Sequence, residues 1–160
     1  MKGGLLRHVL RAPAWLYRWH CGWLLGHRFL LLVHTGRRTG RRHSTVLEVV
    51  EYRREKPELV VMSGLGRGSN WLRNLTAGGD PEIIVGTTRF AATWRELGEA
   101  EAAMVMAGYE QRNRLATPLV RMVLSRLVGW RYDGSDAARR RLVRALPLVA
   151  FRPADESIAE

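Results

Sequence analysis

Four arginines stand within six positions of the chain, between Arg37 and Arg42. A guanidinium group binds phosphate or carboxylate through two parallel hydrogen bonds, so such a cluster can hold an anionic ligand. Gly36 and Gly40 permit the tight backbone geometry of a turn. We therefore expect the segment from Thr35 to Thr45 to bind an anion, with a solvated basic hairpin that binds no ligand as the alternative.

A second loop is rich in glycine. Gly64, Gly66 and Gly68 lie within five positions, between Ser63 and Trp71. Glycine lets the backbone approach another group closely, and the N–H groups of such a loop can hydrogen-bond the edge of a flat heteroaromatic ring. A plain mobile linker is the alternative. Neither loop alone specifies a function.

Short apolar or β-branched segments surround these loops and predict the strands that position them. The expected strands cover residues 29–34, 44–52, 59–62, 82–85, 88–96 and 146–151. In residues 88–96 apolar and polar residues alternate, as in a half-buried antiparallel strand. The order of elements predicts an α+β protein, a small antiparallel barrel or sheet with helices outside it, rather than a doubly wound β-α-β repeat.

Helices are predicted from capping residues and periodicity. A short helix is expected over residues 71–75, a longer one over 99–112, one that begins at Thr117-Pro118 and one capped by Ser135. Ser69 or Asn70 is the expected cap of the short helix. The expected buried face of the helix after Thr117 comprises Leu119, Met122, Val123 and Leu127.

The charge of the chain is strongly positive and unevenly placed. Its 160 residues include 26 Lys and Arg against 15 Asp and Glu, a formal net charge of +11. Residues 1–54 carry +9, 55–113 carry −2, 114–153 carry +7 and 154–160 carry −3. With 46% hydrophobic residues the chain is expected to fold as one domain, and the charge favours an anionic partner. A nucleic-acid binder would interleave aromatic residues with its arginines, and residues 37–42 contain none, so nucleic acid is not favoured.

Several classes of site are not expected. The single Cys21 excludes an internal disulfide and a multi-cysteine metal site. The five histidines have no acidic or cysteine partners at metal-ligand spacing, so no metal is predicted.

The longest uncharged N-terminal stretch, residues 19–27, is about half the ~20 residues of a membrane span, and no secretory signal is evident. We expect a cytoplasmic protein.

The N-terminal segment suggests peripheral attachment at the inner face of the membrane. Leu5, Leu6, Val9 and Leu10 have helical spacing between basic residues, and tryptophans recur every four residues from Trp15 to Trp23. Such a helix can lie on an anionic membrane surface. Packing of the same stripe on the chain's own domain is the alternative.

Together, and in this order, the two loops resemble the deazaflavin-dependent nitroreductase family. The resemblance rests on the run from Leu32 to His43, on Met62-Ser63-Gly64-Leu65-Gly66, on Trp71-Leu72-Arg73-Asn74-Leu75, and on Val85-Gly86 and Phe90. It covers roughly residues 24–97. Members of this family are split β-barrel oxidoreductases that use the 8-hydroxy-5-deazaflavin coenzyme F-420.

The resemblance implies a fold and a division of the chain. The fold is a small antiparallel split β-barrel of the FMN-binding type, with an N-terminal helix and two or three C-terminal helices outside. Residues 1–28 would be a helical extension, residues 29–153 a single domain with a helical insertion near 99–145, and residues 154–160 a disordered acidic tail. A monomer and a homodimer both remain open.

The resemblance also implies cofactor contacts. Arg37, Arg38 and Thr39 fall where the family binds the phosphate end of the coenzyme. Ser63 to Gly66 match the loop that lines the deazaflavin ring, with Gly64 where many members have lysine. Trp71 and Asn74 match the helix that closes over the cofactor. The predicted cofactor-binding residues are Arg37, Arg38, Thr39, Gly40, His43, Thr45, Met62, Ser63, Gly64, Leu65, Gly66, Trp71 and Asn74.

The implied activity is transfer of a hydride from reduced F-420 to an electron-poor acceptor of quinone-like or nitroaromatic type. The protein would orient the partners and supply a proton, for which Tyr109 is the first candidate and Tyr132 the second. Either tyrosine can equally be a core residue. An FMN, haem or bilin binder on the same barrel, and a basic protein that binds nucleic acid or an anionic membrane, are the alternatives.

Overall fold

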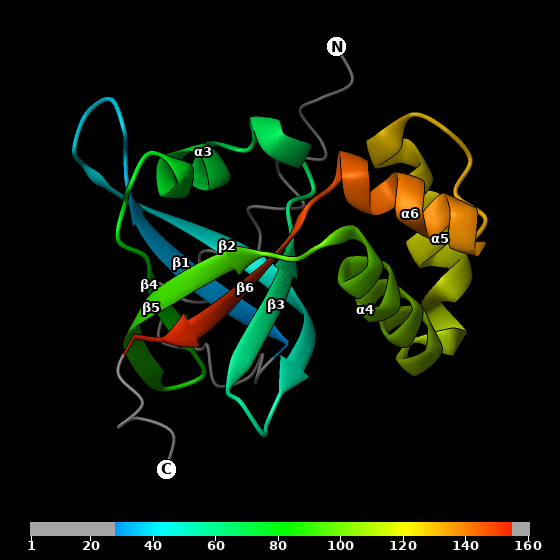
Figure 1. Ribbon diagram of the computed structural model, residues 1–160, viewed down its shortest axis with the longest axis horizontal. Helices are drawn as coiled ribbons and strands as arrows, with labels where there is room; N and C mark the ends of the chain where they lie inside the picture. Colours follow the sequence, from blue (N-terminus) through cyan, green and yellow to red (C-terminus); the bar gives the residue numbers. More distant parts are fainter. Residues whose placement is uncertain (1–27, 155–160) are drawn as a thin grey trace.

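The computed structural model describes residues 28–154, which form an antiparallel β-barrel with the helices of residues 99–145 on one side and a short helix, residues 70–76, over a different part of the barrel (Figure 1). The six strands are β1 (Phe29–Thr35), β2 (Arg42–Arg53), β3 (Glu58–Met62), β4 (Glu82–Val85), β5 (Thr88–Glu96) and β6 (Leu148–Pro153). They follow the order β1-β2-β3-β6-β5-β4, and β4 pairs with β1 to close the barrel. The predicted α+β class and antiparallel barrel are confirmed.

Two hydrophobic cores share strands β3 and β6. The first core fills the barrel and includes Leu30, Ile83 and Phe151, with Trp71 packed from outside the strands. The second lies between the barrel wall and the helices and includes Val60. Because both faces of β3 and β6 are covered, these strands have continuous apolar sequences, whereas β1 alternates buried and half-buried residues.

The helices follow the predicted order. They are α3 (Asn70–Thr76), α4 (Glu99–Arg112), α5 (Thr117–Val128) and α6 (Asp136–Ala145), with short 3-10 turns η2 (Gly66–Gly68) and η3 (Arg114–Ala116). Ser135 caps α6 as expected, because its hydroxyl accepts a hydrogen bond from the Ala138 N–H. Thr117 is the first residue of α5 rather than its cap. Its hydroxyl donates to the carbonyl of Glu110 on α4 and to that of Asn113, the residue that follows α4.

The predicted buried face of α5 is wrong for Leu119, Met122 and Val123 and right for Leu127. Leu119, Met122 and Val123 are 59%, 48% and 40% exposed, and the buried residue of this helix is Leu124. The sequence of α5 contains two apolar stripes, and the one centred on Leu124, with Leu127 at its side, packs on the second core. The other stripe is left at the surface.

A buried carboxylate joins four strands and α4. Glu58 is 1% exposed, and its two oxygens accept hydrogen bonds from Arg53, Arg95 and Arg152 at 2.8–3.2 Å. Glu101 at the start of α4 accepts from Arg53 and Arg95 at 2.8–2.9 Å. The five side chains come from β2, β3, β5, β6 and α4, so the network fixes α4 to the barrel.

Predictions that fall on residues 1–27 and 155–160 lie outside the described residues. They include the N-terminal helix, Cys21 and most of the acidic tail. In the part of the chain that the structure covers, no helix is long and apolar enough to cross a membrane. The division of the chain into an extension, one domain and a tail stays a prediction.

Candidate cofactor site

The arginine-rich segment is the turn between β1 and β2. Its backbone is closed by hydrogen bonds from Gly36 N–H to Arg41 O and from Gly40 N–H to Gly36 O, both 2.8 Å. The Thr39 hydroxyl oxygen accepts from the Arg41 N–H at 3.3 Å. A Cβ on Gly36 would lie 2.8 Å from Nε2 of His43, so a side chain at this position would displace the His43 ring. Thr39 and the glycines therefore shape the turn that presents the arginine side chains.

A chain of hydrogen bonds connects this turn to α3. Burial lowers the pKa of His34 from 6.5 to about 4, with smaller contributions from His43 and Arg42, so its ring is neutral near pH 7. Nδ1 of His34 lies 3.0 Å from Nδ2 of Asn74, and Nε2 lies 3.4 Å from the Thr45 hydroxyl. A neutral ring that accepts at Nδ1 carries its proton on Nε2 and donates it to Thr45.

This arrangement fixes the orientation of the Asn74 amide. Because its nitrogen donates to His34, its oxygen faces the turn, where it accepts from the backbone N–H of Arg37 at 3.2 Å and from Nη1 of the same residue at 2.9 Å. Asn74 is 4% exposed. The asparagine that the sequence places in the closing helix thus holds the first arginine of the turn.

We expect Asn74→Ala to weaken cofactor binding about tenfold and to lower the free energy of unfolding by about 1–3 kcal/mol, since it leaves the His34 ring nitrogen unpaired and releases Arg37. Cofactor titration and urea unfolding measure the two effects. Asn113→Ala is the matched control. The Asn113 side-chain amide donates to the Tyr109 carbonyl of α4 at 2.8 Å, and Asn113 does not line the groove. An unchanged dissociation constant for Asn74→Ala would show that Asn74 does not position Arg37.

The glycine loop between β3 and α3 is closed on itself. The Ser63 hydroxyl lies 2.7 Å from Gly66 O and 2.6 Å from the Ser69 hydroxyl, and all three residues are buried. The N–H groups of Gly66 and Ser69 are used inside the loop. Gly66 has φ +64, and a Cβ there would lie 2.7 Å from Ala145 O. The close backbone approach predicted for this loop is found at Gly66, and its partner is the end of α6.

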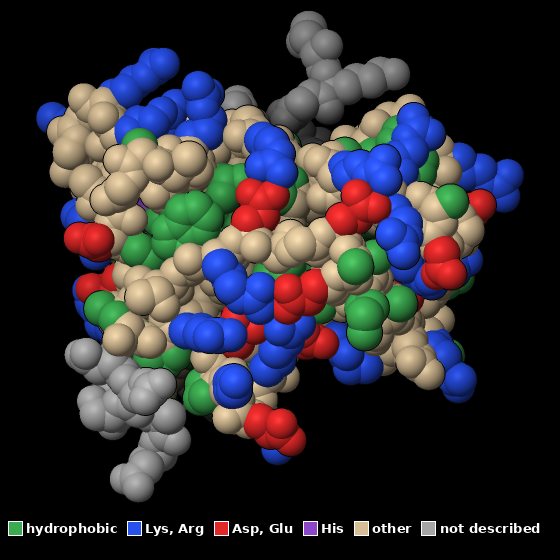
Figure 2. Space-filling view, in the orientation of Figure 1, with side chains coloured by type: hydrophobic (Ala, Val, Ile, Leu, Met, Phe, Trp, Pro, Cys, Tyr) green, Lys and Arg blue, Asp and Glu red, His purple; other side chains and the backbone are tan. Residues whose placement is uncertain are grey.

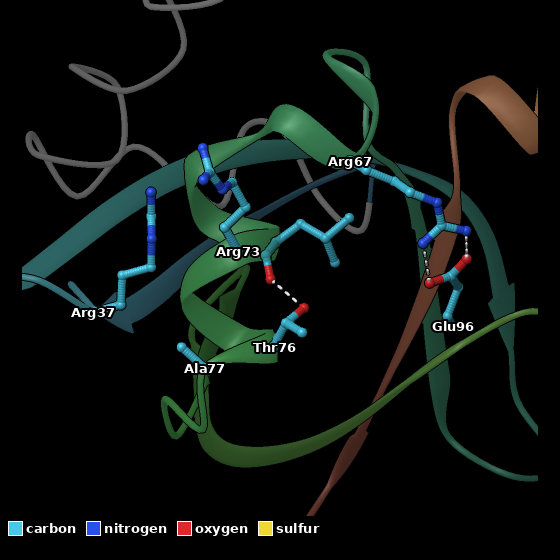
Figure 3. A pocket seen from close by; sticks show the side chains of 7 residues that line it. Arg37, Arg67, Arg73, Thr76, Ala77 and Glu96 are labelled. Atoms are coloured by element: carbon cyan, nitrogen blue, oxygen red, sulfur yellow. Dashed lines mark hydrogen bonds and ion pairs between the residues drawn. The ribbon is translucent and has the colours of Figure 1, made fainter.

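A groove beside α3 brings the two loops together. It has a volume of about 400 Å³ and is lined by residues of the turn, of η2, of α3 and of β5 (Figure 3). The lining residues are Arg37, Arg67, Leu72, Arg73, Thr76, Ala77 and Glu96. Arg67 is held across the groove by an ion pair with Glu96, one contact of which measures 2.9 Å. Arg37 and Arg73 extend in the same direction in this view.

The positive charge at this end of the molecule is not compensated by carboxylates. Within residues 28–154, Arg37, Arg38, Arg41 and Arg73 form no ion pair, whereas Arg42 and Arg67 do. Loss of water contact lowers the pKa of Arg37, and the neighbouring charges of Arg73 and Arg38 lower it further. Figure 2 shows basic side chains gathered over this turn and α3, above a hollow with hydrophobic side chains. An anionic group beside an apolar ring fits such a surface.

Of the predicted cofactor-binding residues, Arg37 alone lines this groove, and the others fall into three groups that do not line it. Asn74 and Thr45 lie in the hydrogen-bond chain behind it, and Arg38, Thr39, Gly40 and His43 belong to the turn. His43 stacks on His34 with ring centroids 5.9 Å apart. The remaining residues lie in or beside the glycine loop: Met62, Ser63, Gly64, Leu65 and Gly66, with Trp71 packed on Phe151 in the barrel core.

Sequence reasoning missed several lining residues. Arg73, Thr76 and Ala77 occupy the exposed face of α3, opposite the buried Trp71, and helical periodicity from Trp71 could have identified them. Arg67 lies in the glycine loop itself. Glu96 is the last residue of β5. Neighbouring residues in the sequence could not identify it as a lining residue, because its partner Arg67 is 29 positions away.

The two tyrosines nominated as proton donors do not line the groove. The Tyr109 hydroxyl donates to Glu48 of β2 at 2.8 Å, and the buried Tyr132 hydroxyl pairs with Glu110 of α4. Burial and these carboxylates raise the pKa of both tyrosines well above the usual range, so both stay protonated. The contacts give them a structural function between helices and barrel, and their catalytic function stays a prediction.

Comparison with known proteins gives one family match. The family model described as F420H(2)-dependent quinone reductase matches residues 10–119. No curated protein matches the chain.

The solved structures that match the chain share little sequence with it. The structure described as F420-H2 dependent reductase FDR-A is 18% identical over 80% of this chain and 96% of its own, with a TM-score of 0.49. The protein Atu2129 from Agrobacterium tumefaciens, of unknown function, is 13% identical over 91% of this chain and 56% of its own, with a TM-score of 0.55. An FMN-binding, pyridoxamine 5'-phosphate oxidase-related protein from Nostoc punctiforme is 16% identical over 89% and 80%, with a TM-score of 0.44. At these identities the Agrobacterium structure shows a shared fold alone.

Proposed function

This chain belongs to the F420H(2)-dependent quinone reductase family, and from that membership we propose that it binds reduced coenzyme F-420 in the groove beside α3 and reduces a quinone-like or nitroaromatic acceptor. Membership of this family identifies the chain as an F-420-dependent oxidoreductase. The position of the coenzyme and the class of acceptor are the parts that we propose.

The observation that carries the proposal is a group of arginines that have no carboxylate partner within residues 28–154. The coenzyme has a phosphate and a glutamate tail at one end. Arg37 and Arg73, which line the groove, and Arg38 beside Arg37 in the turn offer positive charges to such groups. Asn74 keeps Arg37 in place before the ligand arrives, which reduces the entropy lost on binding. The chemistry of these donors therefore fits the anionic end of F-420.

The rest of the groove suits a flat ring. Leu72 and Ala77 offer apolar surface, and the Thr76 hydroxyl is already used in a hydrogen bond to the Leu72 carbonyl at 2.9 Å. When bound, the reduced coenzyme supplies the hydride. The protein orients the two reactants and keeps water from the reacting face, which needs rigid walls more than reactive side chains.

Titration of the full chain with F-420 and with FMN tests this proposal. We expect the deazaflavin fluorescence to change at micromolar coenzyme, and reduced F-420 to be oxidised when menadione is added. Omission of the protein gives the background rate. Binding of FMN together with no response to F-420 would contradict the proposal. Comparison of menadione with a nitroaromatic compound then identifies the preferred acceptor class.

A further inference from the structure

The segment that contains η3 and α5 is basic and has no acidic residue. Between Glu110 and Asp133 the chain carries five arginines and no aspartate or glutamate. The arginines are Arg112, Arg114, Arg121, Arg126 and Arg131. This is the second place, after the β1–β2 turn, where positive charge gathers without local compensation.

The same segment exposes large apolar side chains. Leu115 is fully exposed, and Leu119, Met122 and Val123 continue from it at spacings of four, three and one residues. These spacings put the three α5 residues on one side of the helix, opposite the buried Leu124. We call this surface the α5 face; it comprises Leu115, Leu119, Met122 and Val123 and has Arg126 within it.

Three of the five arginines in this segment are available to a partner, and two are already engaged within the chain. Arg121 is paired with Glu110 at 3.2 Å, and Arg112 donates to Val50 O at 2.7 Å. Over residues 28–154, Arg114, Arg126 and Arg131 form no ion pair, and all three are exposed. Arg114 lies in η3 and Arg126 on α5 within the apolar surface, and Arg131 follows α5 by three residues. An apolar surface with such charges on its own segment favours an occupant that is both apolar and anionic.

The charges of the chain argue against its own segments as that occupant. Residues 1–27 carry Lys2, Arg7, Arg11 and Arg18 and no acidic residue, so they would be repelled by the arginines of the α5 face. A second copy would bring the same arginines together. The acidic residues 155–160 follow β6, which ends at the side of the barrel away from α5 (Figure 1).

We propose that the α5 face docks on an anionic lipid surface. Its apolar side chains enter the boundary between headgroups and acyl chains, and Arg114, Arg126 and Arg131 bind lipid phosphates. Leu127, on the same helix, lies within van der Waals reach of a Cβ built on Gly64. If the proposed function holds, docking therefore brings the glycine loop close to an acceptor dissolved in the bilayer.

Cosedimentation of the full chain with lipid vesicles tests this docking. Vesicles of phosphatidylcholine with about 30% phosphatidylglycerol should bind the chain at least about tenfold more tightly than pure phosphatidylcholine, because each arginine near the surface contributes about fivefold. The double variant Leu119→Gln with Met122→Gln should bind the anionic vesicles about tenfold more weakly. The double variant Arg126→Gln with Arg131→Gln should bind the anionic vesicles about 25-fold more weakly.

Met104→Gln is the matched control, since Met104 is 76% exposed on α4, outside the α5 face. It should change vesicle binding less than about twofold. Unchanged binding of the Leu119 and Met122 double variant would overturn the proposal and leave residues 1–27 as the source of any affinity. Circular dichroism of each variant verifies that it is folded. The assay contains no coenzyme, so its outcome is independent of the F-420 titration.

Discussion

Replacing Arg37 and Arg73 together by alanine should weaken binding of F-420 at least about 100-fold, because each charge-assisted contact contributes about 1.5–3 kcal/mol and 1.4 kcal/mol corresponds to a factor of ten. Both side chains line the groove and neither has a carboxylate partner in residues 28–154. Fluorescence titration of the double variant and of each single variant measures the effect. The Arg73 variant is the cleaner of the two, since Arg37 also contacts Asn74.

Arg54→Ala separates a local contact from a general effect of charge. Arg54 is exposed in the turn between β2 and β3 and has no ion pair in the described part of the chain. Its removal lowers the net charge by the same amount as either groove variant. We expect its affinity for F-420 to change less than about twofold at physiological salt, where distant charges are screened. A loss equal to that of Arg73→Ala would contradict the assignment of the groove.

The second large effect concerns stability. Glu58→Gln should lower the free energy of unfolding by about 3 kcal/mol, because a neutral amide cannot balance the three arginines that converge on this buried position. For a domain of this size the melting temperature should fall by about 6–12 °C. Glu51→Gln is the control: Glu51 pairs with Arg53 alone at 2.7 Å, and its loss should change stability less than about 1 kcal/mol.

The same network predicts how stability depends on pH. Hydrogen bonds from Arg95 and Arg53 lower the pKa of Glu101 to about 2. Burial alone would raise the pKa of Glu58, but Arg95 and Arg152 hold it below its usual range. Because both pKa values are lower in the folded chain than in the unfolded one, this stabilisation is complete above about pH 5 and is lost as the pH falls toward 2. Thermal unfolding between pH 6 and pH 2 measures it, and Glu58→Gln should flatten the profile.

Local patterns predicted most of the fold. The strands 82–85 and 88–96 and the helix 99–112 have the predicted bounds, since apolar periodicity and first-turn acids are properties of adjacent residues. The prediction of the buried face of α5 failed for Leu119, Met122 and Val123 because the sequence of this helix contains two apolar stripes. Only packing against other elements determines which stripe is buried. Strand β6 begins at Leu148, two residues later than expected, directly after Pro147.

The site was less predictable than the fold. Arginine spacing identified the turn, because a bidentate anion donor is recognisable from residue type alone. The hydrogen bond between His34 and Asn74 joins residues 40 positions apart, and that between Arg37 and Asn74 joins residues 37 apart. Such pairs exist only once barrel closure has placed α3 over the turn. The neutral state of His34, which orients the asparagine, follows from the same burial.

Strand β6 has a consequence for how the chain is made. It is the last strand to be synthesised, yet it lies between β3 and β5, and Leu148 to Phe151 are all buried there. Until these residues have left the ribosome, β3 and β5 each keep an unpaired backbone edge. An open edge can pair with a strand of another chain. Closure of the barrel must therefore follow translation of nearly the whole described sequence, and ribosome-bound chains that stop before Leu148 should be a main source of aggregation.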